Sequence, residues 1–202
     1  GVHKDGMMTE YFLHPTRQCF KIPDDMTFIH AALVEPFTIG LHGATRARVK
    51  AGEHVVVFGA GVIGLMASFA CINYGATPIL VDIIQERLDE AKAMGVPFTF
   101  NSRNGGVEEY LKEVINGKLP EAMIDCTGAP SILAEMHNYV CHGGRIALVG
   151  WPHDPVMINT VRLMQKEIDV LPSRNSNKKF PEAIKLIHEG KLPVDALTTR
   201  TC

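Results

Sequence analysis

The sequence predicts an α/β fold built on a doubly wound parallel sheet. From residue 53 onward, short apolar runs alternate with longer segments of helical composition. The apolar runs are continuous, which is typical of strands that are covered by helices on both faces. Repeated strand–helix units of this size imply parallel strands joined by right-handed crossovers. A chain of 202 residues fits one such domain together with a remnant of another.

The elements of this part of the chain follow one another in a regular order. Strands are expected at residues 54–58, 78–82, 97–100, 121–125, 145–149 and 168–171. Helices are expected at residues 62–74, 85–94, 106–116, 131–140 and 180–189. Gly95 and Gly190 follow two of these helices, in the position where glycine commonly ends a helix.

The first part of the chain has a different character. Residues 8–13 and 20–22 are short strand-like runs bounded by turn residues. Two short strands cannot bury a core alone, so this segment is expected at the edge of another domain. A helix is expected over residues 27–49, with a break or kink near Glu35 because Pro36 lies inside it.

Composition and charge exclude several classes of partner. The 20 Lys and Arg residues against 22 Asp and Glu give a formal charge of −2, which provides neither a basic field for nucleic acid nor a polybasic membrane patch. No run reaches the roughly 18 apolar residues of a membrane span. The five cysteines are widely spaced and form no C-x-x-C pair. They are therefore interpreted as free thiols of a reducing compartment, and a cytoplasmic location is expected.

The most specific motif is Gly59-Ala60-Gly61-Val62-Ile63-Gly64. It follows a buried strand and opens a helix, and Asp82 ends the next strand eighteen residues after Gly64. Gly59 permits the tight turn, Gly61 lets backbone amides approach a pyrophosphate, and Gly64 allows the helix to pack closely on the strand. The helix N-terminus then presents unpaired N–H groups to the phosphates. This context predicts a Rossmann-type dinucleotide site; the alternative is a glycine-rich turn without a ligand.

The acid at the end of the second strand predicts NAD rather than NADP. Asp82 is placed to accept hydrogen bonds from the adenosine ribose hydroxyls, and its charge would repel a 2′-phosphate. The next residues are Ile83 and Ile84, so no adjacent cation compensates. Arg87 on the following helix either reaches the adenosine side of the cofactor or pairs on the surface with an acid such as Asp89, and the sequence leaves both open.

Several further motifs accompany the glycine turn and the acid. They are Glu35-Pro36-Phe37, Arg87-Leu88, Asp125-Cys126-Thr127-Gly128, Gly143-Gly144-Arg145, Leu148-Val149-Gly150 and Ser173-Arg174-Asn175-Ser176. In this combination the chain resembles the medium-chain zinc-type alcohol dehydrogenases over nearly its whole length. Within that family it is most similar to the polyol and sugar-acid branch, which includes sorbitol, threonine and L-galactonate dehydrogenases.

The resemblance implies how the chain is organised. Residues 33–202 would form the NAD-binding Rossmann domain, and residues 1–32 would be a remnant of a β-rich, GroES-like catalytic domain with the start of the connecting helix. The family's Cys, His and Glu zinc ligands belong to that catalytic domain, so most of them are missing here. The chain is therefore expected to be a fragment of a longer enzyme, able to bind the cofactor but inactive alone.

The resemblance also implies cofactor contacts at the carboxyl ends of strands: Thr127 and Gly128 beside a ribose, Val149 and Gly150 at the nicotinamide, and Ser173, Arg174 and Asn175 over the cofactor. Open α/β sheets bind their ligands at that edge, although ordinary loop chemistry is the alternative at each position.

The same resemblance gives Glu35 a catalytic role at the zinc, as a ligand or an exchange partner. From the residues alone, Glu35 is a partly exposed acid at a helix kink. The nine histidines share no ligand spacing. His42 lies seven residues after Glu35 and shares its helix face, and a packing role is favoured for it. Core-like positions are likewise assigned to the methionines, which include Met157 and Met164.

The implied activity is oxidation of a secondary alcohol of a polyol, sugar acid or hydroxy amino acid, with zinc stabilising the alkoxide and NAD accepting a hydride. One alternative is a zinc-free NADPH quinone or enoyl reductase of the same superfamily, against which Glu35 and Asp82 argue. A second is a non-catalytic NAD-sensing module. A homodimer or homotetramer is expected, with residues 155–159 as an edge strand of the sheet.

Overall fold

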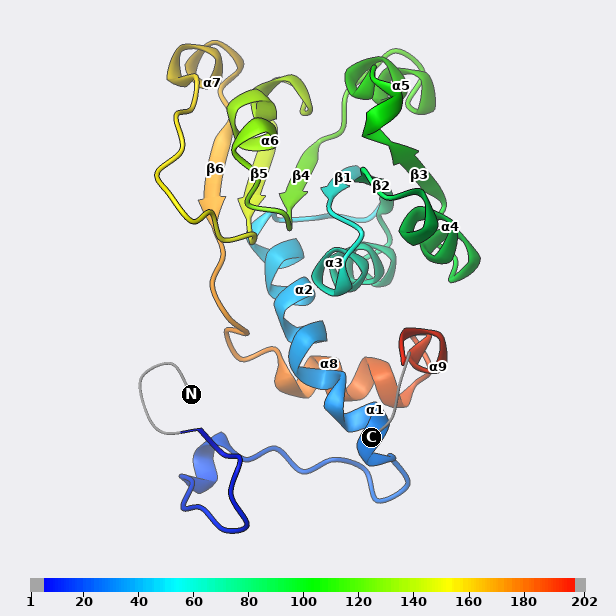
Figure 1. Cartoon of the computed structure of the whole chain (residues 1–202), viewed down its shortest axis with the longest axis vertical. Helices are drawn as coiled ribbons and strands as arrows, with labels where there is room; N and C mark the ends of the chain where they lie inside the picture. The colour runs from blue at the N-terminus through cyan, green and yellow to red at the C-terminus, as the bar shows by residue number, and fades with distance from the viewer. Residues whose placement is uncertain (1–5, 199–202) are drawn as a thin grey trace.

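The computed structural model describes residues 6–198 and contains a parallel sheet flanked by helices (Figure 1). The strands are β1 (His54–Phe58), β2 (Thr77–Asp82), β3 (Phe98–Asn101), β4 (Ala122–Asp125), β5 (Arg145–Leu148) and β6 (Asp169–Pro172). They lie in the order β3-β2-β1-β4-β5-β6, and each neighbouring pair is parallel. The order reverses beside β1, where doubly wound folds bind their ligands. The predicted fold class is therefore confirmed.

Helices cover both faces of this sheet. They are α1 (Phe28–Ala32), α2 (Val34–Arg46), α3 (Val62–Asn73), α4 (Gln85–Ala93), α5 (Val107–Val114), α6 (Pro130–Glu135), α7 (Thr160–Lys166), α8 (Phe180–His188) and α9 (Val194–Leu197). Alternate strand residues enter different cores, as strand geometry requires. Val55 and Val57 pack with side chains from α2, α3, α4 and α8. Val56 and Phe58 pack on the other face with side chains from α5 and α6.

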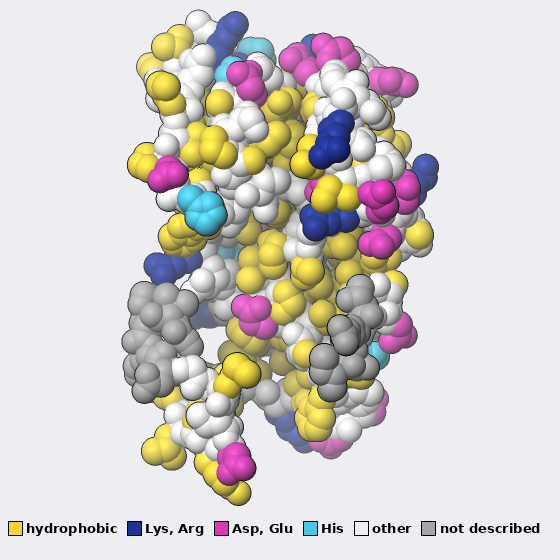
Figure 2. All heavy atoms as spheres, in the orientation of Figure 1, with side chains coloured by type: hydrophobic (Ala, Val, Ile, Leu, Met, Phe, Trp, Pro, Cys, Tyr) yellow, Lys and Arg dark blue, Asp and Glu magenta, His cyan; other side chains and the backbone are white. Residues whose placement is uncertain are grey.

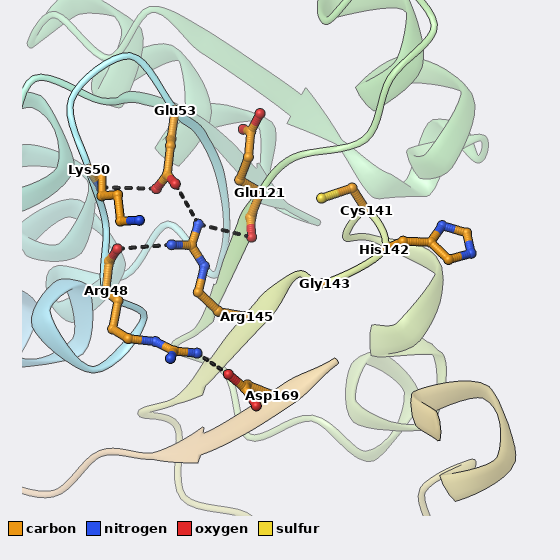
Figure 3. A pocket seen from close by; sticks show the side chains of 9 residues that line it. All are labelled: Arg48, Lys50, Glu53, Glu121, Cys141, His142, Gly143, Arg145 and Asp169. Carbon is orange, nitrogen blue, oxygen red and sulfur yellow. Dashed lines mark hydrogen bonds and ion pairs between the residues drawn. The ribbon is translucent and has the colours of Figure 1, made fainter. Parts of the chain in front are cut away.

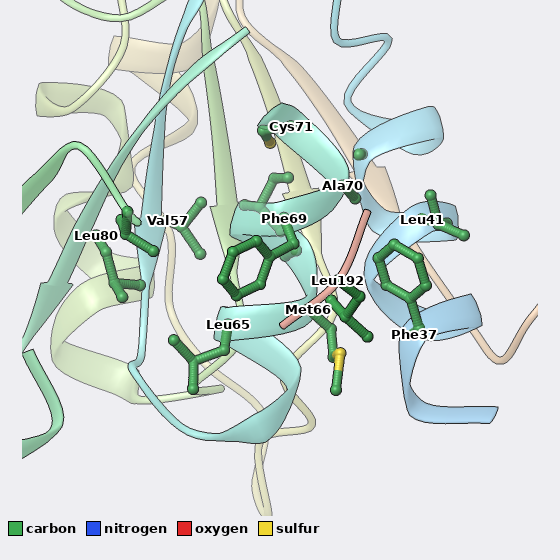
Figure 4. Close-up of a cluster of buried hydrophobic side chains, with 14 of the residues drawn as sticks. Phe37, Leu41, Val57, Leu65, Met66, Phe69, Ala70, Cys71, Leu80 and Leu192 are labelled. Atoms are coloured by element: carbon green, nitrogen blue, oxygen red, sulfur yellow. The ribbon is translucent and has the colours of Figure 1, made fainter. Parts of the chain in front are cut away.

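The larger core lies between α2, α3 and one face of the sheet (Figure 4). Phe37 and Leu41 of α2 and Met66 and Ala70 of α3 are fully buried in it. The two helices meet at Gly40, where a Cβ atom would lie only 2.4 Å from the carbonyl carbon of Met66. The absence of a side chain at this position thus lets α2 lie directly against α3 and next to the site described below.

The expected helix over residues 27–49 is in fact two helices that meet at Leu33. The break thus precedes Glu35 by two residues. Pro36 lies in the first turn of α2, where the missing N–H costs the helix little. The break belongs to the start of a new helix and is not a kink within one.

The strands expected at residues 8–13 and 20–22 are wrong. This segment is irregular, apart from a 3₁₀ turn at Thr16–Gln18. An extended segment gains ladder hydrogen bonds only beside a partner strand, and residues 6–198 provide none for it. Met8 and Leu13 are fully exposed, and hydrophobic side chains gather on this segment at the lower end of the view in Figure 2.

The connection between β5 and β6 also differs from the expectation. Residues 155–159 form no strand, so the outer strands of the described sheet are β3 and β6. Met157 and Met164, which were assigned to the core, are 87% and 78% exposed. Among residues 6–198, no other part of the chain covers these two side chains, one just before α7 and one on it. Within the same residues, none of the helices combines the length and apolar character that crossing a bilayer requires.

The close approach of α2 and α3 gives a first prediction. We expect Gly40→Ala to lower the free energy of unfolding by about 1–3 kcal/mol, despite the better helix propensity of alanine, because the added methyl group must push the two helices apart. Gly61→Ala is the matched control, since its φ is −74° and nothing lies within 4 Å of a Cβ atom built there. Urea denaturation measures both variants, and equal losses would contradict this packing.

Candidate dinucleotide-binding site

The turn between β1 and α3 forms the centre of the candidate site. Gly59 has φ +98°, a conformation that favours glycine. A Cβ atom at Gly64 would lie 1.6 Å from the carbonyl oxygen of Gly59, so α3 begins this close to the turn only because residue 64 is glycine. Gly61 instead borders open space. The turn therefore leaves room for a phosphate group beside the N-terminus of α3.

Two cavities adjoin along the carboxyl edge of the sheet. One, of about 420 Å³, is lined by the glycine turn and the ends of β2 and β4. The other, of about 310 Å³, is lined by α2, the start of α3 and the segments after β5 and β6. Cys126 lines both, so the two cavities are neighbours at the point where the strand order reverses, and we refer to them together as the cleft.

The first cavity brings together several residues predicted from the sequence: Gly59, Gly61, Asp82, Arg87 and Thr127. The Asp82 carboxylate accepts hydrogen bonds from the backbone N–H groups of Ala60, Ile83 and Ile84, the last two at 2.7 and 2.9 Å. These bonds fix the acid to the glycine turn and still leave it an acceptor position. Arg87 faces this cavity and forms no ion pair with any residue in 6–198, which favours the adenosine-side interpretation over the surface pair.

The loop after β4 is held by the buried carboxylate of Asp125. Its Oδ1 accepts from the Thr127 backbone N–H at 3.1 Å and the Thr127 hydroxyl at 2.6 Å, and its Oδ2 accepts from the Gly128 N–H at 3.0 Å. The Asp125 carbonyl oxygen accepts from the N–H groups of Val149 and Gly150 at 2.9 and 2.8 Å. One residue therefore organises both loops that border the middle of the cleft.

The second cavity brings together six further predicted positions: Ile63, Val149, Gly150, Ser173, Arg174 and Asn175. Gly64 and Gly128 line neither cavity. The loops after β4 and β5 touch here, because a Cβ atom at Gly150 would lie 2.1 Å from the Gly128 nitrogen. Trp151 is 75% exposed at the rim, and the Arg174 guanidinium lies 5.8 Å from the centre of its ring.

Several lining residues had no predicted role, among them Ile39 and Cys126. Ile39 lines the second cavity from α2, and its spacing of four residues from Glu35 on one helix was the signal that could have found it. Cys126 lay inside a quoted motif, between two residues with assigned roles. Val62 lies in the predicted motif, yet its side chain is 56% exposed and lines neither cavity.

The predicted metal-site acid lies outside both cavities. Glu35 is exposed in the first turn of α2, one turn before Ile39. Among residues 6–198, no group of three or more His, Cys, Asp or Glu side chains could hold a metal ion. The described residues therefore do not form a zinc site by themselves, and Glu35 is the one ligand that the prediction places on them.

The family model of zinc-binding dehydrogenases matches residues 62–189, which begin at the start of α3, directly after the glycine turn, and include Asp82 and the loops around the cleft. The chain belongs to this family. It is 38% identical to an uncharacterized zinc-type alcohol dehydrogenase-like protein of Haemophilus influenzae, over 99% of this chain and 58% of that protein. It is 31% identical to a D-xylulose reductase of Morganella morganii, over 98% of this chain and 59% of that enzyme.

Solved structures of zinc-binding dehydrogenases and related enzymes share this fold. An alcohol dehydrogenase from E. coli CFT073 in complex with NADH is similar with a TM-score of 0.89 and 31% identity, over 98% of this chain and 58% of that one. A zinc-binding dehydrogenase from Sinorhizobium meliloti 1021 bound to NADP is similar with a TM-score of 0.90 and 28% identity, over 98% and 59%. The chain thus spans less than three fifths of these relatives.

A third cavity, of about 430 Å³, lies at the opposite edge of the sheet in this dehydrogenase-family chain (Figure 3). Four of its charged side chains are paired with one another. The Arg145 guanidinium donates to Glu53 Oε1 at 2.7 Å and to the carbonyl oxygens of Arg48 and Glu121, and Arg48 pairs with Asp169. Because these groups satisfy each other at the amino ends of the strands, we assign the cluster to stability rather than to ligand binding.

A seam with unpaired polar atoms lies between α2 and the segment after β6. Arg46 Nε donates to the Pro172 carbonyl oxygen at 2.8 Å. One helical turn earlier, His42 is 6% exposed, and its Nδ1 has no hydrogen-bond partner among residues 6–198. The buried Ser173 Oγ also lacks one. Since an unpaired buried polar group costs about 1–3 kcal/mol, this seam is the least satisfied part of the cleft.

The electrostatic environment of the seam disfavours a charged imidazole. Burial lowers the pKa of His42 from its ordinary value of 6.5, and the positive charges of Arg46 and Lys179 lower it further. His42 is therefore a neutral, buried histidine of the family fold, which agrees with the predicted packing position but leaves one ring nitrogen without a partner.

This shift predicts a pH dependence of stability. Because the unfolded chain binds a proton at residue 42 before the folded chain does, the folded state loses stability as the pH falls below 6.5. His42→Asn removes the titration. The difference in unfolding free energy between the wild-type chain and the variant should be constant above pH 6.5 and should shrink below it. Urea titrations at several pH values measure this difference, and a constant difference throughout would contradict the environment described.

Proposed function

We propose that this chain is the cofactor-binding part of a zinc-dependent NAD oxidoreductase, which oxidises a secondary alcohol of a polyol, sugar acid or hydroxy amino acid. The observation that carries the proposal is the pair of neighbouring cavities along the carboxyl edge of the sheet, which together we call the cleft. An acid fixed to the glycine turn lies at one end of it, and a pocket bordered by two loops and α2 lies at the other. The two ends of the cleft therefore differ in the same way as the adenosine and nicotinamide ends of an extended dinucleotide.

The residues of the cleft suit the two halves of NAD. Gly61 would admit the pyrophosphate beside the N-terminus of α3, and Asp82 would accept hydrogen bonds from the adenosine ribose. Ile39, Ile63 and Val149 would hold the nicotinamide ring and exclude water from one of its faces. When bound, NAD supplies the site with a hydride acceptor at its nicotinamide ring.

NAD is preferred over NADP because of the charge next to the ribose. The cavity contains Asp82, whose negative charge opposes a 2′-phosphate, and Arg87, which would attract one. Asp82 is anchored by three backbone N–H groups, whereas Arg87 is a long side chain on α4. We therefore give the fixed carboxylate the larger weight. The structural relatives include both an NADH complex and an NADP complex, so the test below compares both cofactors.

The substrate class rests on the relatives and on what the cleft leaves open. The similarity to a D-xylulose reductase favours a polyol. Zinc would be held mainly by side chains outside residues 6–198, with Glu35 contributing one carboxylate from the exposed start of α2. The exposed hydrophobic residues Met8, Tyr11 and Leu13 support the proposal that residues 1–32 are a remnant of the catalytic domain, the rest of which would cover them in the longer protein.

The cofactor can be tested through Trp151, the single tryptophan, which lies at the rim of the second cavity. We expect saturable quenching of its fluorescence by NADH and a much weaker response to NADPH. Gly61→Ala should abolish the response without unfolding the chain, because its methyl group would occupy the space of the pyrophosphate. Equal responses to both cofactors would favour the NADPH reductase, and no response from the folded chain would contradict the proposal.

The proposed role of Glu35 at the zinc is tested in the longer protein that also contains the catalytic domain. We expect Glu35→Ala to lower the zinc content or the rate of alcohol oxidation, while the affinity for NADH stays unchanged, because this residue lies outside both cavities of the cleft. Glu10→Ala, at another exposed acid, is the control. A wild-type protein that contains no zinc and reduces quinones or enoyl substrates with NADPH would support the zinc-free reductase, and one that binds NADH without any turnover would support the sensing module.

A further inference from the structure

The seam between α2 and the segment after β6 contains two buried polar atoms that need a partner, His42 Nδ1 and Ser173 Oγ. Within residues 6–198 they are the only buried side-chain nitrogen or oxygen atoms left without a hydrogen bond. Ser173 itself lines the second cavity, although its hydroxyl is buried. The hydroxyl therefore points away from the cleft and into the protein.

The contacts of α2 show where the His42 ring lies. Ile39, three residues earlier, lines the same cavity as Ser173. Arg46, four residues later, donates a hydrogen bond to the carbonyl oxygen of Pro172. Residues three and four apart share one face of a helix, so His42 lies between these contacts, on the face of α2 that adjoins the segment beginning at Pro172. Figure 1 shows this segment descending beside α2 on its way to α8.

The charges around this segment make the ring an acceptor. Arg46 lies one turn away on α2, and Lys179 precedes α8 and pairs with Glu182 at 2.6 Å. Burial and the two cations lower the pKa of His42, so the imidazole is neutral and one of its nitrogens accepts a hydrogen bond. A serine hydroxyl is a suitable donor for that nitrogen.

We propose that His42 is a positioning residue for the nicotinamide end of the cleft. In the cofactor complex the Ser173 hydroxyl donates to His42 Nδ1, and this bond fixes the segment Ser173–Asn175 beside the nicotinamide ring. The inference rests on the proposed function, because it assigns the second cavity to the nicotinamide. It is narrower than the proposed function, because it concerns only the nicotinamide half of the cofactor. The adenosine half would be bound by the glycine turn and Asp82, which do not take part in the hydrogen bond between His42 and Ser173.

The test compares two ligands that share the adenosine half. NADH carries the nicotinamide, whereas ADP-ribose ends at the second ribose. Both are titrated calorimetrically into the full chain and into its variants His42→Leu, His42→Asn and Ser173→Ala. Leucine fills space but cannot accept a hydrogen bond, whereas asparagine can. His137→Leu is the matched control, because His137 is similarly buried, at 7% exposure, and lies in neither cavity of the cleft.

We expect His42→Leu and Ser173→Ala each to weaken NADH binding about 3- to 10-fold, the effect of one lost hydrogen bond, with ADP-ribose binding unchanged. His42→Asn should regain most of the affinity. The double variant His42→Leu/Ser173→Ala should lose no more than either single variant, because both remove the same bond. The control His137→Leu should bind both ligands like the wild-type chain.

Other outcomes overturn the inference in different ways. Equal weakening of both ligands, together with lost stability, would make His42 a packing residue. Additive losses in the double variant would show that the two groups act separately. If His42→Leu does not fold, Ser173→Ala alone decides, and unchanged NADH affinity in that variant overturns the proposal. A wild-type chain that binds neither ligand would instead refute the proposed function itself.

Discussion

The cleft depends on one buried carboxylate at the end of the central strand β4. Asp125 is fully buried, and its two side-chain oxygens and its carbonyl oxygen together accept five hydrogen bonds from the loops after β4 and β5. A buried carboxylate is tolerated only when it is satisfied in this way. The bonds bring Gly128 and Gly150 into backbone contact, which leaves the cleft open on either side of Cys126.

The glycine turn and the helix pair α2–α3 complete this arrangement. Gly64 sets the start of α3 against the turn, and Gly40 sets α2 against α3. Because α2 is held there, Ile39 reaches the second cavity and His42 reaches the segment after β6. Three close approaches of backbone to backbone, each permitted by glycine, therefore place side chains from distant parts of the sequence around one cleft. The middle of the cleft, where every hydrogen-bonding atom of the Asp125 carboxylate has a partner, thus differs from the end that we assign to the nicotinamide, where His42 Nδ1 and Ser173 Oγ have none among residues 6–198.

Most of the fold was predictable because its signals are local. Continuous apolar runs identified the six strands, and the glycine motif with Asp82 located the centre of the cleft. The predictions failed where the structure of a segment depends on another segment that packs against it. Residues 8–13 have strand-like composition, but no strand lies beside them in residues 6–198. Met157 and Met164 have core-like composition, but no part of the described chain covers them. Ile39 and the seam at His42 depend on how α2 lies against the sheet, which sequence pattern does not specify.

The central claim is that the carboxyl edge of the sheet, and not the charged cavity at its amino edge, binds the dinucleotide. Hydrogen–deuterium exchange of the chain with and without NADH tests it most directly, because both edges are observed in one experiment. The account predicts slower exchange with NADH in peptides covering residues 59–65, 126–129 and 173–175, and no change in residues 48–54 and 141–145. Protection confined to the second group, around Arg145 and Glu53, would contradict it.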